Sequence, residues 1–186
     1  MKKNCLLLVL LAWMMMPVYG AKGDKNDPIR NQITWTSLSA PSNDEGDIEN
    51  IYIDYMTPDG QEHHIICELP WTMNANVFAN CVIEEEDINF DGIPDMQVPV
   101  GFFDGTGHNP MYMYYVWDVE DHQFMELPDP LFIAPVLDQE SRSITSSLVQ
   151  ENPDNHQAYT IYFQKYVWKG DKLELTKEWS EEFTLE

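Results

Sequence analysis

One nine-residue segment of the chain carries oxygen-bearing side chains at alternate positions. From Asp87 to Asp95 the sequence reads D-I-N-F-D-G-I-P-D, with Asp or Asn at positions 1, 3, 5 and 9 and glycine at position 6. Calcium is a hard cation that takes oxygen ligands, and the EF-hand loop supplies them from alternate residues, with glycine at position 6 for the sharp turn. The segment therefore predicts a calcium loop, with Ca²⁺ as the cofactor.

The positions in this loop also predict the ligands. They are, in chain order, Asp87, Asn89, Asp91, the carbonyl of Ile93, and Asp95 either directly or through water. Position 12, where the standard loop has a bidentate glutamate, is a valine, and the following M-Q-V-P-V-G-F is typical of a strand rather than of an exiting helix. The alternative is an acidic turn that binds nothing. Because no substrate-binding apparatus is visible nearby, we expect the ion to hold a loop in place.

The elements that must position this loop are strands. Aromatic and β-branched residues dominate four alternating runs, which are residues 51–55, 111–117, 159–168 and 173–177. Turn signals separate the runs at Pro58-Asp59-Gly60, Asp104-Gly105, Glu120-Asp121 and Lys169-Gly170-Asp171. No segment has sustained helical periodicity with caps at both ends. We expect a single all-β domain, residues 32–186, of about eight or nine antiparallel strands in a sandwich or barrel, propeller-like in arrangement.

The amino terminus predicts export. Lys2 and Lys3 precede an apolar run from Leu6 to Met16, and small residues lie three and one positions before Ala21, which is typical of a Sec signal peptide over residues 1–20. No later segment is long and apolar enough to cross a bilayer. We expect residues 21–31 to form a flexible leader. The periplasm is the expected compartment, with the cell surface or secretion as alternatives.

The charge of the chain bounds its partners. Without residues 1–20 the chain keeps 8 basic and 32 acidic residues, which is a net charge of −24. This charge argues against nucleic acid as a partner, because nothing neutralises phosphates along a track. It favours a cationic partner through long-range steering. The alternative is that the charge only keeps the protein soluble in the envelope.

Two cysteines remain after the signal peptide, Cys67 and Cys81. A lone pair of cysteines in an oxidising compartment is usually a disulfide. The segments around them are typical of adjacent strands, and a hairpin turning around Trp71 to Asn76 would bring the two cysteines opposite one another. We therefore predict a Cys67–Cys81 disulfide, which stabilises the fold by roughly 3 kcal/mol for a loop of about 15 residues.

The order of motifs after the calcium loop is distinctive. A strand follows the loop, and then come F-D-G-T-G-H-N-P-M-Y from Phe103, Y-Y-V-W-D from Tyr114, and Y-V-W-K-G-D-K-L-E-L from Tyr166. This order resembles a family of exported bacterial β-proteins related to periplasmic inhibitors of invertebrate-type lysozyme, some of which are immunity proteins against secreted peptidoglycan hydrolases. The resemblance covers residues 84–179.

The resemblance implies an eight-stranded antiparallel β fold with structural calcium. It also implies inhibition by a protruding loop that enters the active-site cleft of the hydrolase. The family loop commonly carries Ser-Gly-x-Tyr. In this chain the nearest stretch is Thr106-Gly107-His108-Asn109, and the next tyrosine, Tyr112, stands five residues after the glycine.

The polar, glycine-containing segment around residues 104–112 is also the best candidate contact surface on physical grounds. The expected contact residues are Thr106, Gly107, His108, Asn109 and Tyr112. The calcium loop lies close in sequence and would stiffen the base of this segment, which lowers the ordering cost of binding. The alternative is an ordinary hairpin connection whose glycines meet backbone demands. A second candidate is the long polar loop that we expect from Glu151 to Tyr159.

No catalytic constellation emerges from the sequence. It contains no G-x-S-x-G, no cysteine with a plausible base and no phosphate-cradling glycine loop, and paired carboxylates are uninformative among 32 acids. We therefore expect a protein that is not an enzyme. The leading hypothesis is an inhibitor of a lysozyme-like peptidoglycan hydrolase. The alternatives are a calcium-stabilised carbohydrate-binding or surface-assembly module and, with the least support, a hydrolase.

Overall fold

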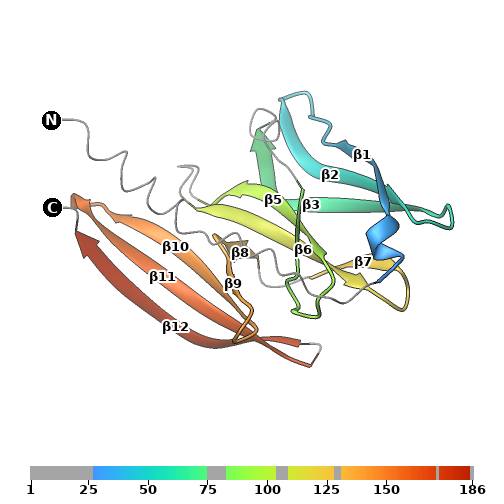
Figure 1. The fold of residues 1–186 in the computed structure, drawn as a ribbon. Helices are drawn as coiled ribbons and strands as arrows, with labels where there is room; N and C mark the ends of the chain where they lie inside the picture. Colours follow the sequence, from blue (N-terminus) through green and yellow to red (C-terminus); the bar gives the residue numbers. More distant parts are fainter. Residues whose placement is uncertain (1–26, 75–82, 104–108, 128–130, 171, 185–186) are drawn as a thin grey trace, which may run out of the picture.

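The chain folds into three antiparallel β-sheets that follow one another along the sequence (Figure 1). The structure is a computed structural model and describes residues 27–74, 83–103, 109–127, 131–170 and 172–184. Sheet A contains β1–β3, sheet B contains β4–β8 and sheet C contains β9–β12, in the strand orders β1-β2-β3, β4-β5-β6-β7 and β12-β11-β10-β9, with β8 pairing with β6.

The elements have the following bounds. A short 3-10 helix, η1 (Arg30–Gln32), precedes the first strand. Sheet A is made of β1 (Thr34–Ser39), β2 (Asp47–Met56) and β3 (Glu62–Asn74). Sheet B is made of β4 (Glu84–Glu86), β5 (Asp95–Phe102), β6 (Pro110–Asp118), β7 (Gln123–Glu126) and β8 (Phe132–Ile133). Sheet C is made of β9 (Val136–Asp138), β10 (Ser143–Asn152), β11 (Asn155–Lys169) and β12 (Lys172–Thr184).

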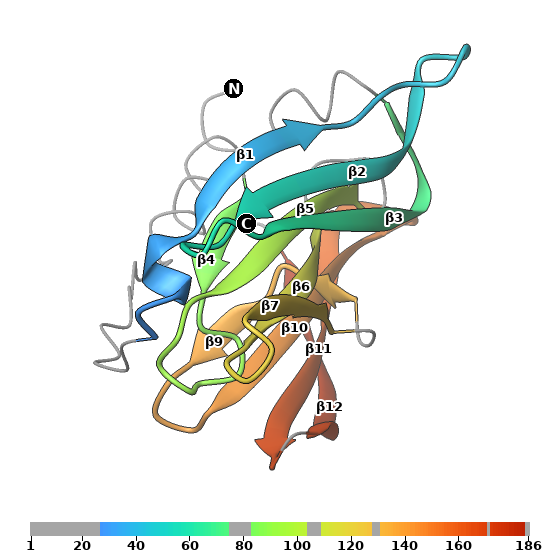
Figure 2. The same ribbon diagram turned by 90° about the vertical axis from the view of Figure 1, so that its right-hand side faces the viewer.

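Sheet B lies between the other two sheets, as Figures 1 and 2 both show. On one side its residues form a core with sheet A, which includes Ile53, Tyr55, Val98, Met111 and Trp117. On the other side they form a second core with sheet C, which includes Tyr114, Phe132, Ile144 and Tyr166. A strand that is covered on both faces has no solvent side, so the residues on both of its faces are buried. This explains why residues 95–98 of β5 are all buried.

The sequence-based strands and turns are largely confirmed. All four alternating runs lie within strands. Pro58-Asp59-Gly60 joins β2 to β3, and Gly60 has a φ of 86°, which only glycine adopts without strain. The all-β class is therefore as predicted, but the described residues form twelve strands in three open sheets. The described strands do not close into a barrel, and the three sheets stack in a sandwich-like arrangement of three layers.

Of the predicted leader, residues 21–31, the structure describes only residues 27–31. These five residues pack against the domain, with Arg30 only 3% exposed. The guanidinium of Arg30 lies over the ring of Phe124, 5.0 Å from its centroid. Its Nε donates a hydrogen bond to the carbonyl of Pro94 (2.8 Å), and its Nη2 pairs with Glu85 (2.9 Å). These contacts fix residues 27–31, so the predicted boundary at residue 31 lies too far along the chain.

The predicted hairpin near the cysteines is also displaced. Residues 71–74, which the sequence places in a turn, lie within β3, where Met73 pairs with Ile48 of β2. Cys67 is buried in the core between sheets A and B, and burial raises the pKa of its thiol to about 11. Cys81 lies outside the described residues, so the disulfide stays a prediction.

Side chains that bond to the main chain join sheet B to sheet C. The Asn109 side chain, fully buried, accepts a hydrogen bond from the N–H of Val149 (2.7 Å) and donates one to its carbonyl (2.8 Å). Ser146 Oγ bonds in the same way to both main-chain groups of Ile133, each at 2.9 Å. At Val149 and at Ile133 a side chain thus takes the place of a neighbouring strand. It pairs with main-chain N–H and C=O groups that would otherwise have no hydrogen-bond partner at the sheet edge.

Asn109→Ala tests this link between the layers. The change leaves the N–H and C=O of Val149 without their partner in a buried place, so we expect a loss of about 2 to 4 kcal/mol in the free energy of unfolding. Urea unfolding measures the loss. Gln150→Ala, which removes an exposed amide from the same strand, is the control and should change the unfolding free energy by less than about 0.5 kcal/mol. Equal effects of the two changes would contradict the assigned role.

Candidate functional site

The candidate site is the loop between β4 and β5, residues 87–94, together with Asp95 at the start of β5. The loop lies between the layers, because Ile93 belongs to the core shared with sheet A, whereas Ile88 and Phe90 belong to the core shared with sheet C. Gly92 has a φ of 89°. The sharp turn expected at position 6 of the loop is therefore present.

The polar side chains of the loop fold inward onto its own backbone. Asp87 Oδ1 and Oδ2 accept hydrogen bonds from the N–H groups of Asp91 and Gly92, each at 2.9 Å. Asn89 Oδ1 also accepts from the Asp91 N–H (3.0 Å), and Asp91 Oδ1 accepts from the Ile93 N–H (2.7 Å). Each carboxylate oxygen has two lone pairs, so one remains available after it accepts one N–H. Three of the predicted side-chain ligands thus converge on one short stretch of backbone.

Asp95 is the most deeply buried acid of the loop, with 0% of its surface exposed. Its Oδ2 accepts from the Ile88 N–H (2.9 Å) and its Oδ1 from the Trp117 N–H (2.8 Å), which ties the loop to β6. Burial raises the pKa of Asp95 to about 8, and the nearby charges of Asp91 and Asp87 add to the rise. Burial also raises the pKa of Asp87. Crowded acids of this kind are stabilised by a cation.

Groups from three other parts of the fold hold the loop backbone. Trp168 Nε1 of β11 donates to the carbonyl of Ile88 (2.8 Å), and Arg142 Nη2 donates to the carbonyl of Asn89 (3.2 Å). The amino-terminal segment is the third part, because Arg30 Nε donates to the carbonyl of Pro94, as described above. A change in the loop would therefore disturb its hydrogen bonds with sheet B, sheet C and the amino-terminal segment at η1 together.

The donor set of the loop fits calcium better than a softer metal. All its candidate side-chain ligands offer oxygen, with carboxylates at three positions and an amide at one, and hard cations prefer such ligands. Within the described part of the chain, however, no three His, Cys, Asp or Glu side chains stand close enough together to hold a metal ion. Calcium ligation by Asp87, Asn89, Asp91, Ile93 and Asp95 therefore stays a prediction.

An amino-terminal contact next to the loop was not predicted from the sequence. Asp27 Oδ2 accepts a hydrogen bond from Trp117 Nε1 (2.8 Å), while its Oδ1 accepts from the N–H groups of Ile29 (2.8 Å) and Arg30 (3.1 Å). Trp117 thus bonds to Asp27 through its indole and to Asp95 through its backbone. Asp before Pro is a common helix-start signal, and Arg30 is the only Lys or Arg between positions 26 and 141. The Asp27-Pro28 pair and the isolated Arg30 are therefore the two sequence signals that could have pointed to this contact.

The predicted contact segment is described only at its ends. Thr106, Gly107 and His108 lie outside the described residues. Asn109 is buried, with its side chain on Val149, so it anchors the segment and is not presented to a partner. Tyr112 is half-buried on β6, where it packs beside the core shared with sheet C. The second candidate, residues 151–159, is wrong as a long loop, because β10 and β11 pair up to Asn152 and Asn155.

These observations define an all-β protein of three stacked sheets, each made of antiparallel strands, with an acidic loop that lies between the layers. Among the described residues no helix is long and apolar enough to pass through a membrane. Comparison of the chain with models of protein families, with curated proteins and with solved structures finds no match.

The Asp27 contact predicts a pH dependence of stability. Burial opposes ionisation, but the hydrogen bonds from Trp117, Arg30 and Ile29 outweigh it and lower the pKa of Asp27 below 3.8. A carboxyl whose folded pKa is lowered contributes stability above its unfolded pKa and loses it as the pH falls through the folded pKa. Wild type should therefore lose stability relative to Asp27→Asn below about pH 4. Urea unfolding from pH 3 to pH 7 measures the difference, and parallel curves would contradict the assignment.

Proposed function

We propose that this chain is a non-catalytic calcium-binding protein of the cell envelope that binds and inhibits a lysozyme-like peptidoglycan hydrolase. The observation that carries the calcium part is the fully buried Asp95, whose pKa is raised to about 8 by burial and by the nearby charges of Asp91 and Asp87. A cation there would replace the proton that Asp95 otherwise retains at neutral pH. Its role is structural, because the loop contacts both cores.

The segment after β5 supports a binding role. The N–H of Phe103 donates to the carbonyl of Asn109 (2.9 Å), which closes the base of the segment between them. The buried side chain of Asn109 then fixes this base to β10. Two aromatic side chains stay exposed there, Phe102 at 38% and Phe103 at 52%. A fixed base with exposed aromatic residues lowers the ordering cost of binding a partner.

Charge selects the kind of partner. The chain has a formal net charge of −22, which steers cationic proteins toward it. Its cationic side chains on sheet C are few, and Lys169 is already paired with Glu174. A cationic hydrolase is therefore a better match than an acidic partner or a nucleic acid.

One observation favours the alternative, a calcium-stabilised carbohydrate-binding or surface-assembly module. Phe163 of β11 and Trp179 of β12 stack with 4.8 Å between ring centroids, and Lys177 Nζ lies 4.6 Å from the Trp179 centroid. Aromatic rings on a sheet face can bind the apolar faces of sugars. Loss of glycan binding on Trp179→Ala, with no hydrolase inhibited by wild type, would support this alternative.

Calcium should raise the melting temperature of the protein. At free calcium about 100 times the Kd, binding adds about 2.7 kcal/mol to stability, which corresponds to roughly 5 to 10 °C for a chain of this size. Asp87→Ala combined with Asp91→Ala should abolish the rise, because it removes two ligands. Asp44→Ala with Asp121→Ala removes the same charge from exposed positions and should keep it. A rise of equal size in both double variants would exclude the assigned ligands.

The inhibitor proposal is tested with residues 21–186 and a panel of peptidoglycan hydrolases that spans several lysozyme classes. We expect stoichiometric inhibition of cell-wall lysis by at least one member, weaker in a chelator because the ion stiffens the scaffold. The Asp87→Ala, Asp91→Ala double variant should behave in calcium as wild type does in chelator. Neither inhibition nor binding across the panel would overturn the proposal.

A further inference from the structure

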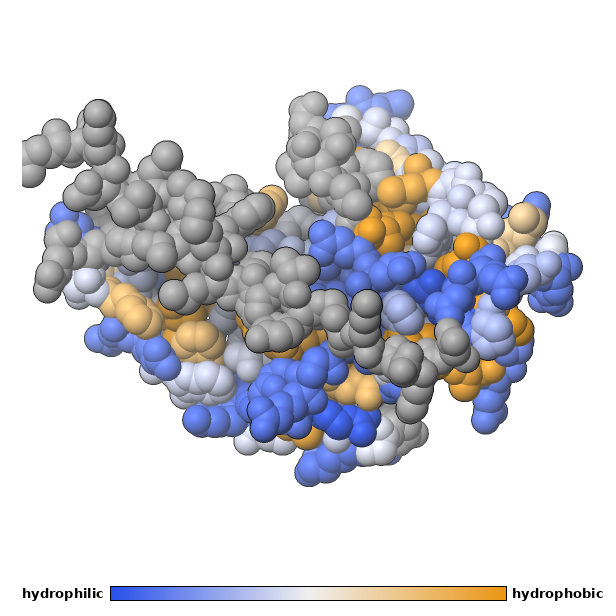
Figure 3. Space-filling model, in the orientation of Figure 1, coloured by the Kyte–Doolittle hydropathy of each residue, from blue (hydrophilic) through white to orange (hydrophobic). Residues whose placement is uncertain are grey.

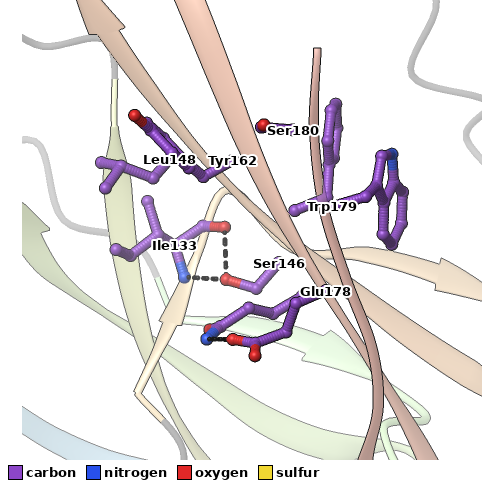
Figure 4. A pocket seen from close by; sticks show the side chains of 9 residues that line it. Ile133, Ser146, Leu148, Tyr162, Glu178, Trp179 and Ser180 are labelled. Carbon is purple, nitrogen blue, oxygen red and sulfur yellow. Dashed lines mark hydrogen bonds between the residues drawn. The ribbon is translucent and has the colours of Figure 1, made fainter.

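A pocket of about 470 Å³ lies between sheet C and β8, far along the chain from the acidic loop (Figure 4). Its volume falls in the range of roughly 300 to 1,000 Å³ that is typical of ligand pockets. Its lining includes Ile133 of β8, Leu148 of β10, Tyr162 and Gln164 of β11, and Glu178 and Ser180 of β12. The residues on the three strands of sheet C are cross-strand neighbours, since Tyr162 pairs with both Leu148 and Ser180.

A chain of hydrogen bonds orients the carboxylate of Glu178 in this pocket. The buried Tyr166 donates its hydroxyl to Gln164 Oε1 (3.0 Å), and Gln164 Nε2 donates to Glu178 Oε1 (2.8 Å). Burial raises the pKa of Tyr166, and the charge of Glu178 adds to the rise, so the hydroxyl keeps its proton. Glu178 Oε2 has no hydrogen-bond partner among the described residues. The pocket thus holds a carboxylate with one oxygen fixed by a hydrogen bond and the other open.

The remaining walls are apolar or aromatic. Figure 4 shows Leu148 beside Tyr162 and Ile133 facing them, with Glu178 below. Tyr162 keeps 45% of its surface exposed. An aromatic ring next to a carboxylate binds cations through its π face, and aliphatic walls cover the methylene stem of a long cationic side chain.

Near Glu178 the pocket face of β12 carries a second acid, while the cationic Lys177 lies over the ring of the lining residue Trp179. Successive strand residues point to opposite faces, so Glu182, two positions after Ser180, lies on the pocket face of β12, whereas Lys177 lies on the other face. Lys165 pairs with Lys177 and also lies on the other face. Figure 3 shows apolar surface mixed with hydrophilic surface over the strands of sheet C. The pocket therefore combines negative charge, an aromatic ring and apolar walls.

We propose that this pocket receives an arginine or lysine side chain from a cationic protein partner, with Glu178 as its counter-ion. The proposal rests on the proposed function for the identity of that partner, a peptidoglycan hydrolase. Arginine is the better occupant, because its planar guanidinium matches a carboxylate and stacks on a tyrosine ring. A charged anchor held in a preformed pocket is the kind of contact that dominates an interface.

The pocket can be tested without a hydrolase. The probe is N-acetyl-arginine amide, titrated in the millimolar range into the chain of residues 21–186 at low salt, with methyl and side-chain amide resonances followed by NMR. We expect saturable shifts at Ile133, Leu148 and Gln164. The citrulline analogue, which has nearly the same shape without the charge, should give none. Glu178→Gln should weaken the arginine shifts at least fivefold, because it removes the counter-ion.

A matched variant separates this effect from general charge. Glu181→Gln removes the same charge from the opposite face of β12. The glutamine still offers an oxygen that can accept the hydrogen bond that Trp179 Nε1 donates to Glu181 (3.2 Å). This variant should therefore leave the shifts unchanged. Absent shifts, or equal shifts in the wild type and in Glu178→Gln, would overturn the proposal. Shifts with chitotriose in place of the arginine probe would also overturn it, in favour of a glycan pocket.

The hydrolase panel distinguishes the failure of the pocket from the failure of the proposed function. If wild type inhibits a hydrolase, Glu178→Gln should weaken the inhibition about tenfold or more, and Glu181→Gln should not. Equal inhibition by all three proteins overturns the pocket proposal and leaves the proposed function intact. Arginine binding without inhibition of any hydrolase overturns the proposed function and supports a cation-accepting pocket for another basic protein.

Discussion

The burial of sheet B on both faces is the constraint on which the other features of this fold depend. A strand with sheets on either side has both faces buried. β5 therefore has four consecutive buried residues, with Met96 and Val98 in the core shared with sheet A and the polar Asp95 and Gln97 alternating with them. β6 divides its side chains, with Tyr115 and Trp117 toward sheet A and Tyr114 toward sheet C. Any polar group placed in this layer must find its hydrogen bonds inside the protein, because water does not reach it.

Three buried polar side chains in or beside the layer, Asp95, Asn109 and Ser146, meet that demand by bonding to main-chain groups. Asp95 satisfies the N–H groups of Ile88 and Trp117. Asn109 and Ser146 satisfy both main-chain groups of Val149 and Ile133, respectively. Each of these bonds crosses from one element to another. The same residues that remove a desolvation penalty therefore also set the distances between the layers.

The acidic loop and the pocket on sheet C lie at different places and have different expected roles. The loop is enclosed by β6, β11 and the amino-terminal segment, which suits an ion that stiffens the scaffold. The pocket is open and carries one oriented carboxylate, which suits contact with a partner. In a chain with a net charge of −22, both features carry negative charge, but the loop acid Asp95 is fully buried whereas the Glu178 carboxylate is exposed.

The sequence by itself determined the elements that depend on local rules. Alternating runs predict the long strands, and glycine with neighbouring polar residues predicts the turn at Gly60 and the sharp bend at Gly92. The spacing of acids is enough to single out the loop of residues 87–95. These features are readable because strand period and turn chemistry involve residues close together in the chain.

Only the tertiary structure decided how these elements are layered and what surrounds the loop. Nothing local in the sequence says that Arg30 lies over Phe124, 94 positions away, or that Asn109 bonds to Val149, 40 positions away. The pocket likewise needs β8, β10, β11 and β12 together. Such contacts are set by which faces must be buried against each other, and that is a property of the whole chain rather than of any segment.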